Sequence, residues 1–313
     1  MGEPDRLLVA DQVHPRPRGR VQRGARAVTA ETVAVTGGNG RLARATIAYV
    51  RRVSPETTVV AAARRPEAAE GVDAEVRYAD YDDVASLRAA FRGVNRLLLV
   101  SGTEVGRRVE QHTHAAEVAA QSGVRHIAYT SAPRVDSSDL AFGPEHLASE
   151  QAILDVGVPY TFLRDNWYHE NFEPRIRRAM ATGSFFGNAG SGRVASAALV
   201  EYGEAAGIVL TSAGHEDRVY ELAGDRSWSY AELAEEVSRA LRRDITYEDL
   251  SEADHIARLV AEGKPRAIAE VEAAIERNTA DGALSSGDGS LSELLGHETE
   301  PIAVAVRRII RAL

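Results

Sequence analysis

Residues 32–43 decide the fold, and they read Thr32-Val33-Ala34-Val35-Thr36-Gly37-Gly38-Asn39-Gly40-Arg41-Leu42-Ala43. The first five residues form a short apolar run that ends in glycines, which is typical of a buried strand in a parallel sheet. Helical periodicity follows over residues 41–53, with Leu42, Ile47 and Val50 on its apolar side. The stretch therefore predicts a strand, a tight glycine turn and a helix in direct succession.

The glycine turn has the spacing G-x-x-G-x-x-A in the strand–turn–helix context that a dinucleotide-binding turn requires. Gly37 permits the tight turn, Gly40 lets the backbone approach a pyrophosphate, and Ala43 allows the helix to pack closely on the strand. The helix N-terminus supplies free N–H groups for the phosphates. The alternative is an ordinary turn between a strand and a helix.

Strands and helices alternate along the next 130 or so residues, as in a parallel sheet with helices on both faces. Further strands are expected at 58–63, 76–80, 97–101, 126–131 and 160–164, with helices at 82–92, 109–122 and 145–155. After residue 164 the alternation weakens: short strands near 185–186 and 219–221 mix with helices near 201–212, 229–241, 251–262, 265–277 and 302–313, and 281–290 is expected to be a loop.

We therefore predict an α/β fold with a Rossmann-type, doubly wound parallel sheet over residues 31–164. Residues 165–313 are expected to form a smaller mixed α/β lobe that covers the substrate, with some elements returning to the core.

In such sheets ligands bind at the carboxyl ends of the strands. The candidate site residues at these ends, with their immediate followers, are Gly37, Arg64, Asp80, Ser101, Ser131 and Arg164. An NAD site places an acid at the end of the second strand, whereas an NADP site places arginine there. The sequence has Arg64 and Arg65 at this point, so it predicts NADPH, with Arg64 better placed for the 2′-phosphate. A solvated surface pair is the alternative.

One expected catalytic pair is absent. Short-chain dehydrogenases typically use Tyr-x-x-x-Lys, but Lys264 is the only lysine and Val260 stands four residues before it. At the corresponding place the chain has His146, which could polarise a carbonyl or donate a proton. A structural or surface role for His146 is the alternative.

Aromatic and amide side chains follow the sixth expected strand, over residues 166–172. Such groups suit a flat, weakly polar ligand beside a nicotinamide, and Trp167 and Tyr168 are the candidates for aligning it. Aromatic packing within the second lobe is the alternative.

Composition excludes several other chemistries. The formal net charge of -9 argues against a protein that binds nucleic acid through its phosphates, and the absence of cysteine excludes thiolate catalysis and cysteine-ligated metals. The histidines are scattered, so no metal site is expected. No apolar stretch approaches the ~20 residues that cross a bilayer, so we expect no membrane partner and a cytoplasmic location.

Residues 1–30 differ from the rest, because they are rich in arginine and lack apolar periodicity. They are expected to be a disordered extension or to result from a start codon assigned too early. A basic arm or a transit-like segment is the alternative.

Several strings taken together resemble the NmrA-like atypical short-chain dehydrogenases, and within that family the bacterial NADPH:quinone oxidoreductases. The strings are Thr36-Gly37-x-x-Gly40, Arg64-x-Pro66, Ala79-Asp80-Tyr81, residues 97–101, Glu104-Val105-Gly106, residues 127–131, Leu163-Arg164-x-x-Trp167-Tyr168-x-Glu170-Asn171, and residues 219–225, 250–254 and 295–297. The resemblance covers roughly residues 32–310 and leaves the amino-terminal extension outside.

The resemblance implies cofactor contacts at Gly37, Gly38, Asn39, Gly40, Arg41, Leu42, Arg64, Ser101, Gly102, Thr103 and Asn171. The sequence departs from the family at two points. Asp165-Asn166 stands where the quinone reductases tend to have Asn-Gly, and Gln151 stands where a lysine is common.

The leading expectation is an NADPH-dependent reductase that transfers hydride directly to a quinone. A quinone is a good hydride acceptor and water can protonate the quinol, so the protein mainly has to align two rings. The rival is a redox-sensing regulator that binds NADP(H) without turnover, which the missing Tyr/Lys pair also permits. The sequence leaves a homodimer open.

The amino-terminal extension is tested by deleting residues 2–28. Its composition cannot bury much apolar area, so we expect the melting temperature and the cofactor affinity to stay nearly unchanged. Thermal unfolding and cofactor titration of the shortened and full chains would check this, and a large loss in either would show that the segment packs on the domain.

Overall fold

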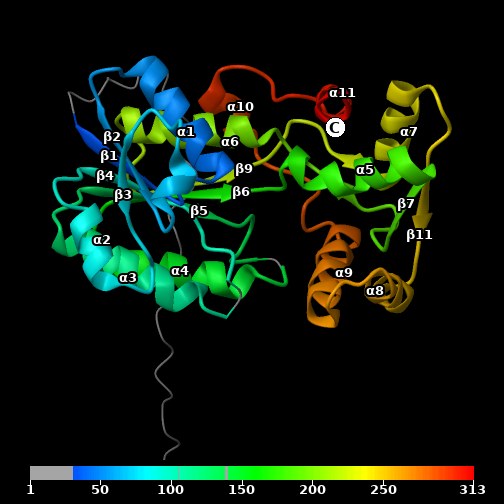
Figure 1. Cartoon of the computed structure of the whole chain (residues 1–313), viewed down its shortest axis with the longest axis horizontal. Helices are drawn as coiled ribbons and strands as arrows, with labels where there is room; N and C mark the ends of the chain where they lie inside the picture. The colour runs from blue at the N-terminus through cyan, green and yellow to red at the C-terminus, as the bar shows by residue number, and fades with distance from the viewer. Residues whose placement is uncertain (1–30, 105, 138–139) are drawn as a thin grey trace, which may run out of the picture.

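Strand pairing builds one seven-stranded sheet in the order β3-β2-β1-β4-β5-β6-β9, with every neighbouring pair parallel (Figure 1). The computed structural model describes residues 31–104, 106–137 and 140–313, so the expectations for residues 1–30 lie outside the described residues. The chain runs outward from β1 to β3 and then returns to β4 on the other side of β1. This reversal is the doubly wound topology expected from the sequence.

The strands follow the apolar runs closely. They are β1 (Thr32–Thr36), β2 (Thr58–Ala63), β3 (Glu75–Tyr78), β4 (Arg96–Leu99), β5 (His126–Ser131), β6 (Tyr160–Asp165) and β9 (Arg218–Leu222). Two predicted strands end early, at Tyr78 and Leu99, so Asp80 and Ser101 lie in the loops that follow them. Side chains in these loops can turn toward a ligand, whereas those within the sheet are fixed by its pleat.

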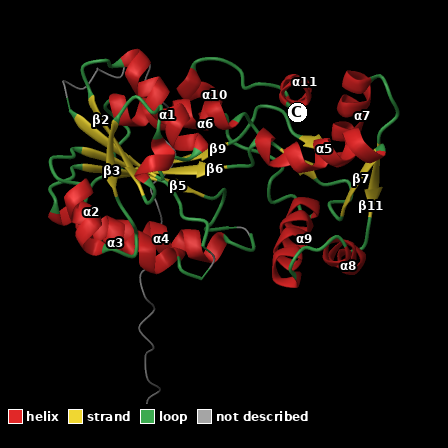
Figure 2. Ribbon diagram, viewed as in Figure 1, coloured by secondary structure: helices red, strands yellow, loops and turns green. Residues whose placement is uncertain are grey.

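Helices cover both faces of the sheet (Figure 2). One face carries α1 (Arg41–Val53), α6 (Leu199–Thr211) and α10 (Ser290–Leu295), and the other carries α2 (Val84–Ala90), α3 (Arg108–Gln121) and α4 (Gly143–Asp155). Successive side chains of β1 point to opposite faces of the sheet. Val33 and Val35 pack in the core under α1 and α6, and Ala34 packs in the core under α2 and α3. Two apolar faces explain why the inner strands β1, β2 and β4 are almost continuously hydrophobic, whereas the edge strands β3 and β9 carry charged residues.

The remaining elements form a lobe beyond the carboxyl ends of the strands (Figure 1). They are η2 (His169–Phe172), α5 (Glu173–Thr182), β7 (Ser184–Gly187), β8 (Arg193–Val194), β10 (Trp228–Ser229), α7 (Tyr230–Leu241), β11 (Thr246–Asp249), α8 (Glu252–Ala261), α9 (Arg266–Ala280) and α11 (Ile302–Ala312); the short η1 (Pro66–Ala69) follows β2. An apolar cluster that includes Phe172, Phe185 and Val237 forms the core of the lobe. No helix in the described ranges is long and apolar enough to cross a membrane.

The chain after residue 164 contains elements that its sequence pattern did not predict. Helix α5 buries only Ile176 and Ala179, so its apolar period is too sparse to recognise, and the lobe strands β8, β10 and β11 and the core helix α10 are short. Conversely, α6, β9 and α10 come after residue 164 and pack on the core, as elements that return to it.

The packing of α1 on α6 depends on two glycines of α6. A Cβ atom at Gly203 would lie 2.5 Å from the Ala45 Cβ and 3.1 Å from the Thr46 backbone nitrogen. At Gly207 it would lie 2.5 Å from the ring of Tyr49. The two helix backbones therefore approach more closely than any residue with a side chain would allow.

Gly203→Ala should destabilise the protein by roughly 1–3 kcal/mol, because the new methyl group meets backbone that cannot move away. The loss should appear although alanine is intrinsically the better helix former. Gly207→Ala is the matched control, since the half-buried Tyr49 ring can rotate, and its loss should be smaller. Urea unfolding of both variants would measure the difference, and equal effects would contradict this account.

Candidate functional site

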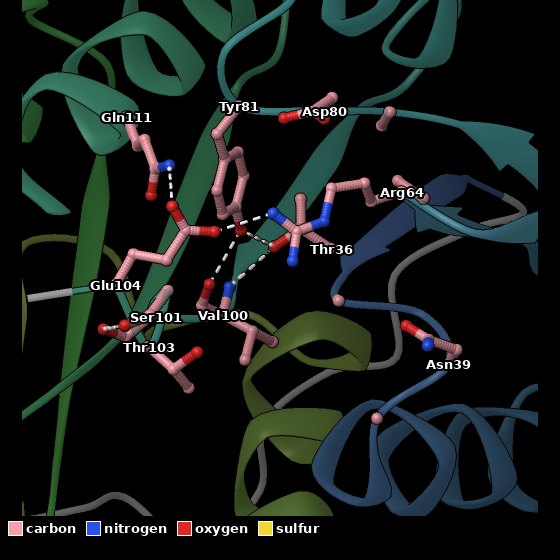
Figure 3. Close-up of a pocket in the computed structure, with 15 residues that line it drawn as sticks. Thr36, Asn39, Arg64, Asp80, Tyr81, Val100, Ser101, Thr103, Glu104 and Gln111 are labelled. Atoms are coloured by element: carbon pink, nitrogen blue, oxygen red, sulfur yellow. Dashed lines mark hydrogen bonds and ion pairs between the residues drawn. The ribbon is translucent and has the colours of Figure 1, made fainter. Parts of the chain in front are cut away.

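A cavity of about 290 Å³ lies where β1, β2, β3 and β4 end (Figure 3). It is lined by Thr36, Gly37, Asn39, Gly40, Ala62, Arg64, Ala79, Asp80, Tyr81, Val100, Ser101, Gly102, Thr103, Glu104 and Gln111. Gly37, Asn39, Gly40, Arg64, Ser101, Gly102 and Thr103 were all predicted from the sequence as cofactor contacts. The fold brings these residues together because parallel strands end at the same edge of a sheet.

The glycine turn forms a cradle of bare backbone. Gly37 has a φ of +60°, which favours glycine, and the Gly40 N–H donates to the Gly37 carbonyl at 2.7 Å. Gly38 does not line the cavity; a Cβ there would lie 2.9 Å from Ala61, so this glycine allows the turn to contact β2. Helix α1 then begins with no acidic residue in its first turn, which leaves its positive end available to a phosphate.

The opposite wall is the loop after β4, and a buried histidine holds it. The Gly102 N–H donates to His112 Nε2 at 3.0 Å, and Arg108 Nε donates to the Gly102 carbonyl at the same distance. Burial, aided by the charge of Arg108, lowers the pKa of His112 to about 3, so the ring is neutral and can accept this bond. Nothing in the sequence pattern around His112 predicts this contact, because it joins α3 to a loop that only the fold brings near.

A tyrosine joins two strand ends beneath the cavity. The Tyr81 hydroxyl lies 2.5 Å from Thr36 Oγ1 and 2.7 Å from the Val100 carbonyl, and the Val100 N–H donates to the same threonine oxygen. Burial raises the pKa of Tyr81 well above its ordinary value. Tyr81 therefore holds the ends of β1 and β4 in register. Two sequence signals pointed to Tyr81: it directly follows the strand-end candidate Asp80, and it belongs to the string Ala79-Asp80-Tyr81 of the family resemblance.

Arg64 stands at the outer edge of the cavity, at the end of β2, whereas Arg65 does not line it. Its Nη1 donates to Glu104 Oε1 at 2.7 Å, across the mouth of the cavity. Asp80 lines the same edge. It comes from the loop after β3, whereas the acid of an NAD site stands at the end of β2.

A second, larger cavity of about 780 Å³ is lined mainly by the lobe. Arg41 at the start of α1 lies at its edge, and the rest of its lining comes from Trp167, from Asn171 in η2 and from elements that include α5, β7, α8 and α9. Arg41 and Asn171, both predicted as cofactor contacts, thus face this cavity. Leu42 is buried in the core beneath α1, so only its backbone is available to a ligand.

Trp167 and Tyr168, the two candidate aligning residues, point in different directions. Trp167 lines the second cavity and stacks on Phe142. Tyr168 lines neither cavity in the described part of the chain; its ring packs 4.9 Å from that of Tyr202, and its hydroxyl donates to Asp165 Oδ2 at 2.9 Å. The catalytic role of Tyr168 stays a prediction, and its contacts make it part of the wall behind the site.

Asp165 is a buried carboxyl group with few partners. Its Oδ1 is buried without a hydrogen bond among the described residues, and burial raises the pKa of this group to about 8. The hydrogen bond from Tyr168 acts in the opposite direction but does not compensate. Asp165 is therefore largely protonated near neutral pH.

His146 lies away from both cavities as far as the structure describes them. Its Nδ1 is 2.8 Å from the Tyr129 hydroxyl, and burial lowers its pKa to about 3. A neutral imidazole that contacts a buried tyrosine fits a structural role better than proton donation. The catalytic role of His146 stays a prediction that this geometry does not favour.

Arg164 and Ser131, two further candidates at strand ends, line neither cavity among the described residues; both instead contact Glu150. Arg164 donates to both oxygens of Glu150, at 3.0 and 2.8 Å, and to Glu221 at 2.9 Å, while Ser131 donates to Glu150 at 2.6 Å. Residue 150 is separated from both strands in the sequence, so only the tertiary structure reveals this cluster.

Three features together define a dinucleotide-binding Rossmann protein. They are a parallel sheet whose strand order reverses at β1, a glycine turn that opens a helix, and an arginine at the end of β2. In agreement, the sequence matches the NAD(P)H-binding family over residues 37–201. The chain belongs to that family, and the resemblance to the NmrA-like atypical short-chain dehydrogenases is confirmed.

Relatives cover nearly the whole chain. Quinone oxidoreductase 2 of Escherichia coli strain K12 is 39% identical over 280 residues, which are 88% of this chain and 98% of that protein. A crystal structure of the Escherichia coli enzyme QOR2 with NADPH superposes with a TM-score of 0.86 and covers 89% and 99% of the two chains at 39% identity. Triphenylmethane reductase of Citrobacter sp. with NADP(H) gives a TM-score of 0.84, 33% identity and coverage of 88% and 99%.

Arg64→Ala should weaken the binding of NADPH much more than that of NADH, by roughly 1.5–3 kcal/mol, because a charged hydrogen bond to the 2′-phosphate is lost. Calorimetric titration of both cofactors would measure the difference. Arg65→Ala is the control and should affect the two cofactors alike. An equal loss of both cofactors in Arg64→Ala would reject the assignment.

Asp165→Asn tests the buried carboxyl group. Its folded pKa lies above its ordinary value, so its stabilising contribution is complete below about pH 4 and is lost as the pH rises through about 8. Across this window the variant should gain stability relative to the natural chain, by at most roughly 1.4 kcal/mol per pH unit. Urea unfolding at several pH values would measure this gain. The exposed Asp155→Asn should show no such trend, and a parallel pH profile for Asp165→Asn would contradict the prediction.

Proposed function

We propose that the protein is an NADPH-dependent reductase that transfers hydride directly to quinones. The observation that carries the proposal is the second cavity, which begins beside the phosphate-binding end of α1 at Arg41 and extends past Trp167 into the lobe. The two cavities are adjacent at consecutive residues, since Gly40 lines the first and Arg41 the second, and a two-substrate oxidoreductase needs a cofactor site beside an acceptor site.

The residues of the first cavity fit the cofactor. The bare backbone of Gly37 and Gly40 and the N-terminus of α1 would hold the pyrophosphate, and Arg64 would bind the 2′-phosphate. Bound NADPH supplies the hydride. Ser101, Gly102 and Thr103 close the other side, on a loop that His112 and Arg108 fix in place.

The second cavity suits a flat acceptor without charge. Trp167 is the half-buried aromatic residue of its lining, whereas Phe185, Phe186 and Tyr230 are buried. The guanidinium groups of Arg175 and Arg178 lie over Tyr230 and Phe186. The lobe side of the cavity carries cations that are already paired: Arg178 donates to both oxygens of Glu262 at 2.7 and 2.8 Å, and Lys264 to both oxygens of Glu272 at 2.6 Å.

Arg175 is likewise paired with Glu276. The Trp167 ring beside neutralised charges favours an uncharged, planar molecule such as a quinone over an anion.

The two kinds of group expected to deliver a proton to the acceptor, a Tyr/Lys pair and His146, line neither cavity among the described residues. The sequence has no Tyr-x-x-x-Lys, and His146 is neutral and buried beside Tyr129. A quinone accepts hydride readily, and water can protonate the resulting quinol anion to the quinol. The protein then mainly has to align two rings, and Trp167, which lines the second cavity, would do so.

The relatives support this reading over the regulatory alternative. The protein that is 39% identical is named a quinone oxidoreductase, and its structure with NADPH covers almost the same length of chain. No described feature of the site favours a sensor without turnover. A cytoplasmic location and a homodimer stay predictions from the sequence.

The proposal predicts that quinones are reduced with consumption of NADPH, whereas simple aldehydes and ketones are not. Simple carbonyls need a proton as the alkoxide forms, a contribution of typically ~10²–10⁴-fold that this site lacks. Trp167→Ala should lower quinone turnover with little change in NADPH affinity, and Trp167→Phe should restore much of it. Stopped-flow mixing of the NADPH complex with naphthoquinone would measure these rates.

Two outcomes would contradict the proposal. Tight NADPH binding with no quinone-dependent oxidation would favour the regulatory alternative. Loss of quinone turnover in His146→Ala, in a variant that still folds and binds NADPH, would replace alignment with acid catalysis by histidine.

A further inference from the structure

The arginine that would bind the 2′-phosphate already has an anionic partner. Arg64 Nη1 lies 2.7 Å from Glu104 Oε1, and both side chains line the first cavity (Figure 3). Arg64 comes from the end of β2 and Glu104 from the loop after β4, so the pair spans the mouth. The hydrogen bond that Arg64 donates to Glu104 is the largest cause of a raised pKa at Arg64, with smaller contributions from the charges of Glu104, Asp80 and Asp82.

The balance of charge in this cavity is unusual for a phosphate site. Among the described residues that line it, Arg64 is the only cation, whereas Asp80 and Glu104 are both carboxylates. A cofactor with a pyrophosphate and a 2′-phosphate must therefore bind where acids already outnumber bases. Glu104, one of these acids, is already paired with Arg64, the residue that would bind the 2′-phosphate.

Glu104 is held in position from its own side of the cavity. The Gln111 amide donates to its second carboxylate oxygen at 3.4 Å, and His112 and Arg108 fix Gly102 two residues earlier. The pair itself is open to water, since the side chains of Arg64 and Glu104 are 58% and 41% exposed. Exposed ion pairs contribute little to stability, so this pair can open at small cost.

We propose that Glu104 is an intramolecular substitute for the 2′-phosphate, which occupies Arg64 in the free protein and is displaced when NADPH or NADP⁺ binds. A carboxylate and a phosphate engage a guanidinium through the same fork geometry, and the phosphate carries more charge. Glu104 thereby lowers the affinity for the phosphorylated cofactors and returns to Arg64 as the oxidised product leaves. NADH has no group to displace it. The inference rests on the proposed use of NADPH.

The test is Glu104→Gln, which keeps the shape of the side chain and removes its charge. Calorimetric titration should show NADPH and NADP⁺ binding roughly threefold to tenfold more tightly, while the affinity for NADH changes less than about twofold. Glu110→Gln is the matched control, because it removes the same charge from an exposed residue of α3 that pairs with Arg107 outside the cavity. This control should leave the ratio of the two affinities unchanged.

A double variant separates direct competition from a general effect of charge. In the Arg64→Ala background, Glu104→Gln should no longer tighten NADPH selectively, because there is no guanidinium to release. An undiminished gain there would show that Glu104 repels the phosphate through space, and would overturn the proposed substitution at Arg64.

A second result would also overturn it. A carboxylate at this edge could instead accept a hydrogen bond from a ribose hydroxyl, as acids in NAD sites do. Glu104→Gln would then weaken both NADH and NADPH. Since every readout is a binding constant, a failure of quinone reduction leaves this inference standing, and unchanged affinities would reject it even if quinones are reduced.

Discussion

The position of β1 between β2 and β4 is the constraint on which the rest of the molecule depends. The chain leaves β1 toward β2 and β3 and returns to β4 on the other side, so the loops after β1 and β4 diverge at one point of the sheet edge. The glycine turn lies on one side of this point and the loop 100–104 on the other. Tyr81 fixes their separation through Thr36 and Val100.

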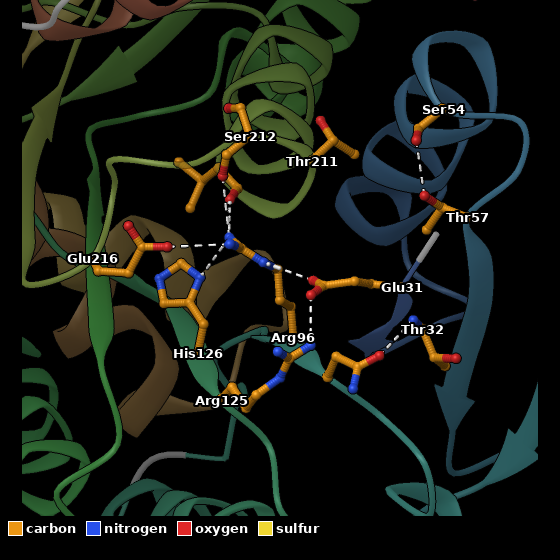
Figure 4. A network of polar contacts seen from close by, with 12 residues as sticks. Glu31, Thr32, Ser54, Thr57, Arg96, Arg125, His126, Thr211, Ser212 and Glu216 are labelled. Carbon is orange, nitrogen blue, oxygen red and sulfur yellow. Dashed lines mark hydrogen bonds and ion pairs between the residues drawn. The ribbon is translucent and has the colours of Figure 1, made fainter. Parts of the chain in front are cut away.

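Buried arginines stabilise the parts of the sheet that do not bind a ligand. At the edge where the strands begin, Arg96 donates to Glu31, His126, Glu216 and the carbonyls of Val209 and Ser212 (Figure 4). A buried guanidinium is tolerated only when its donors are satisfied, and here the partners come from strands and from the end of α6. Arg164 plays a similar part between β6, α4 and β9.

Charges at the two cavities are used differently. In the first cavity, Asp80 and Glu104 accompany the one arginine among the described lining residues, and the proposed competition at Arg64 would tune the affinity for a phosphorylated cofactor. In the second, the cations of α5 and of the segment after α8 are each neutralised by an acid of the α8–α9 region, beside the half-buried ring of Trp167. An oxidoreductase that must release its oxidised cofactor and accept uncharged molecules benefits from both arrangements.

The sheet, the glycine turn and the position of Arg64 at a strand end could be predicted from the amino-acid sequence, because they follow from short apolar runs, from glycine's freedom at Gly37 and from one strand end. Local pattern carries that information, since strands and turns are specified by neighbouring residues. The side-chain contacts become visible in the folded chain alone: Glu104 with Arg64, His112 with Gly102, and Arg164 with Glu150. The tertiary structure also separated Trp167 from Tyr168 and placed His146 away from both cavities. These contacts join residues far apart in the chain, so they depend on how helices pack on the sheet, which no local pattern encodes.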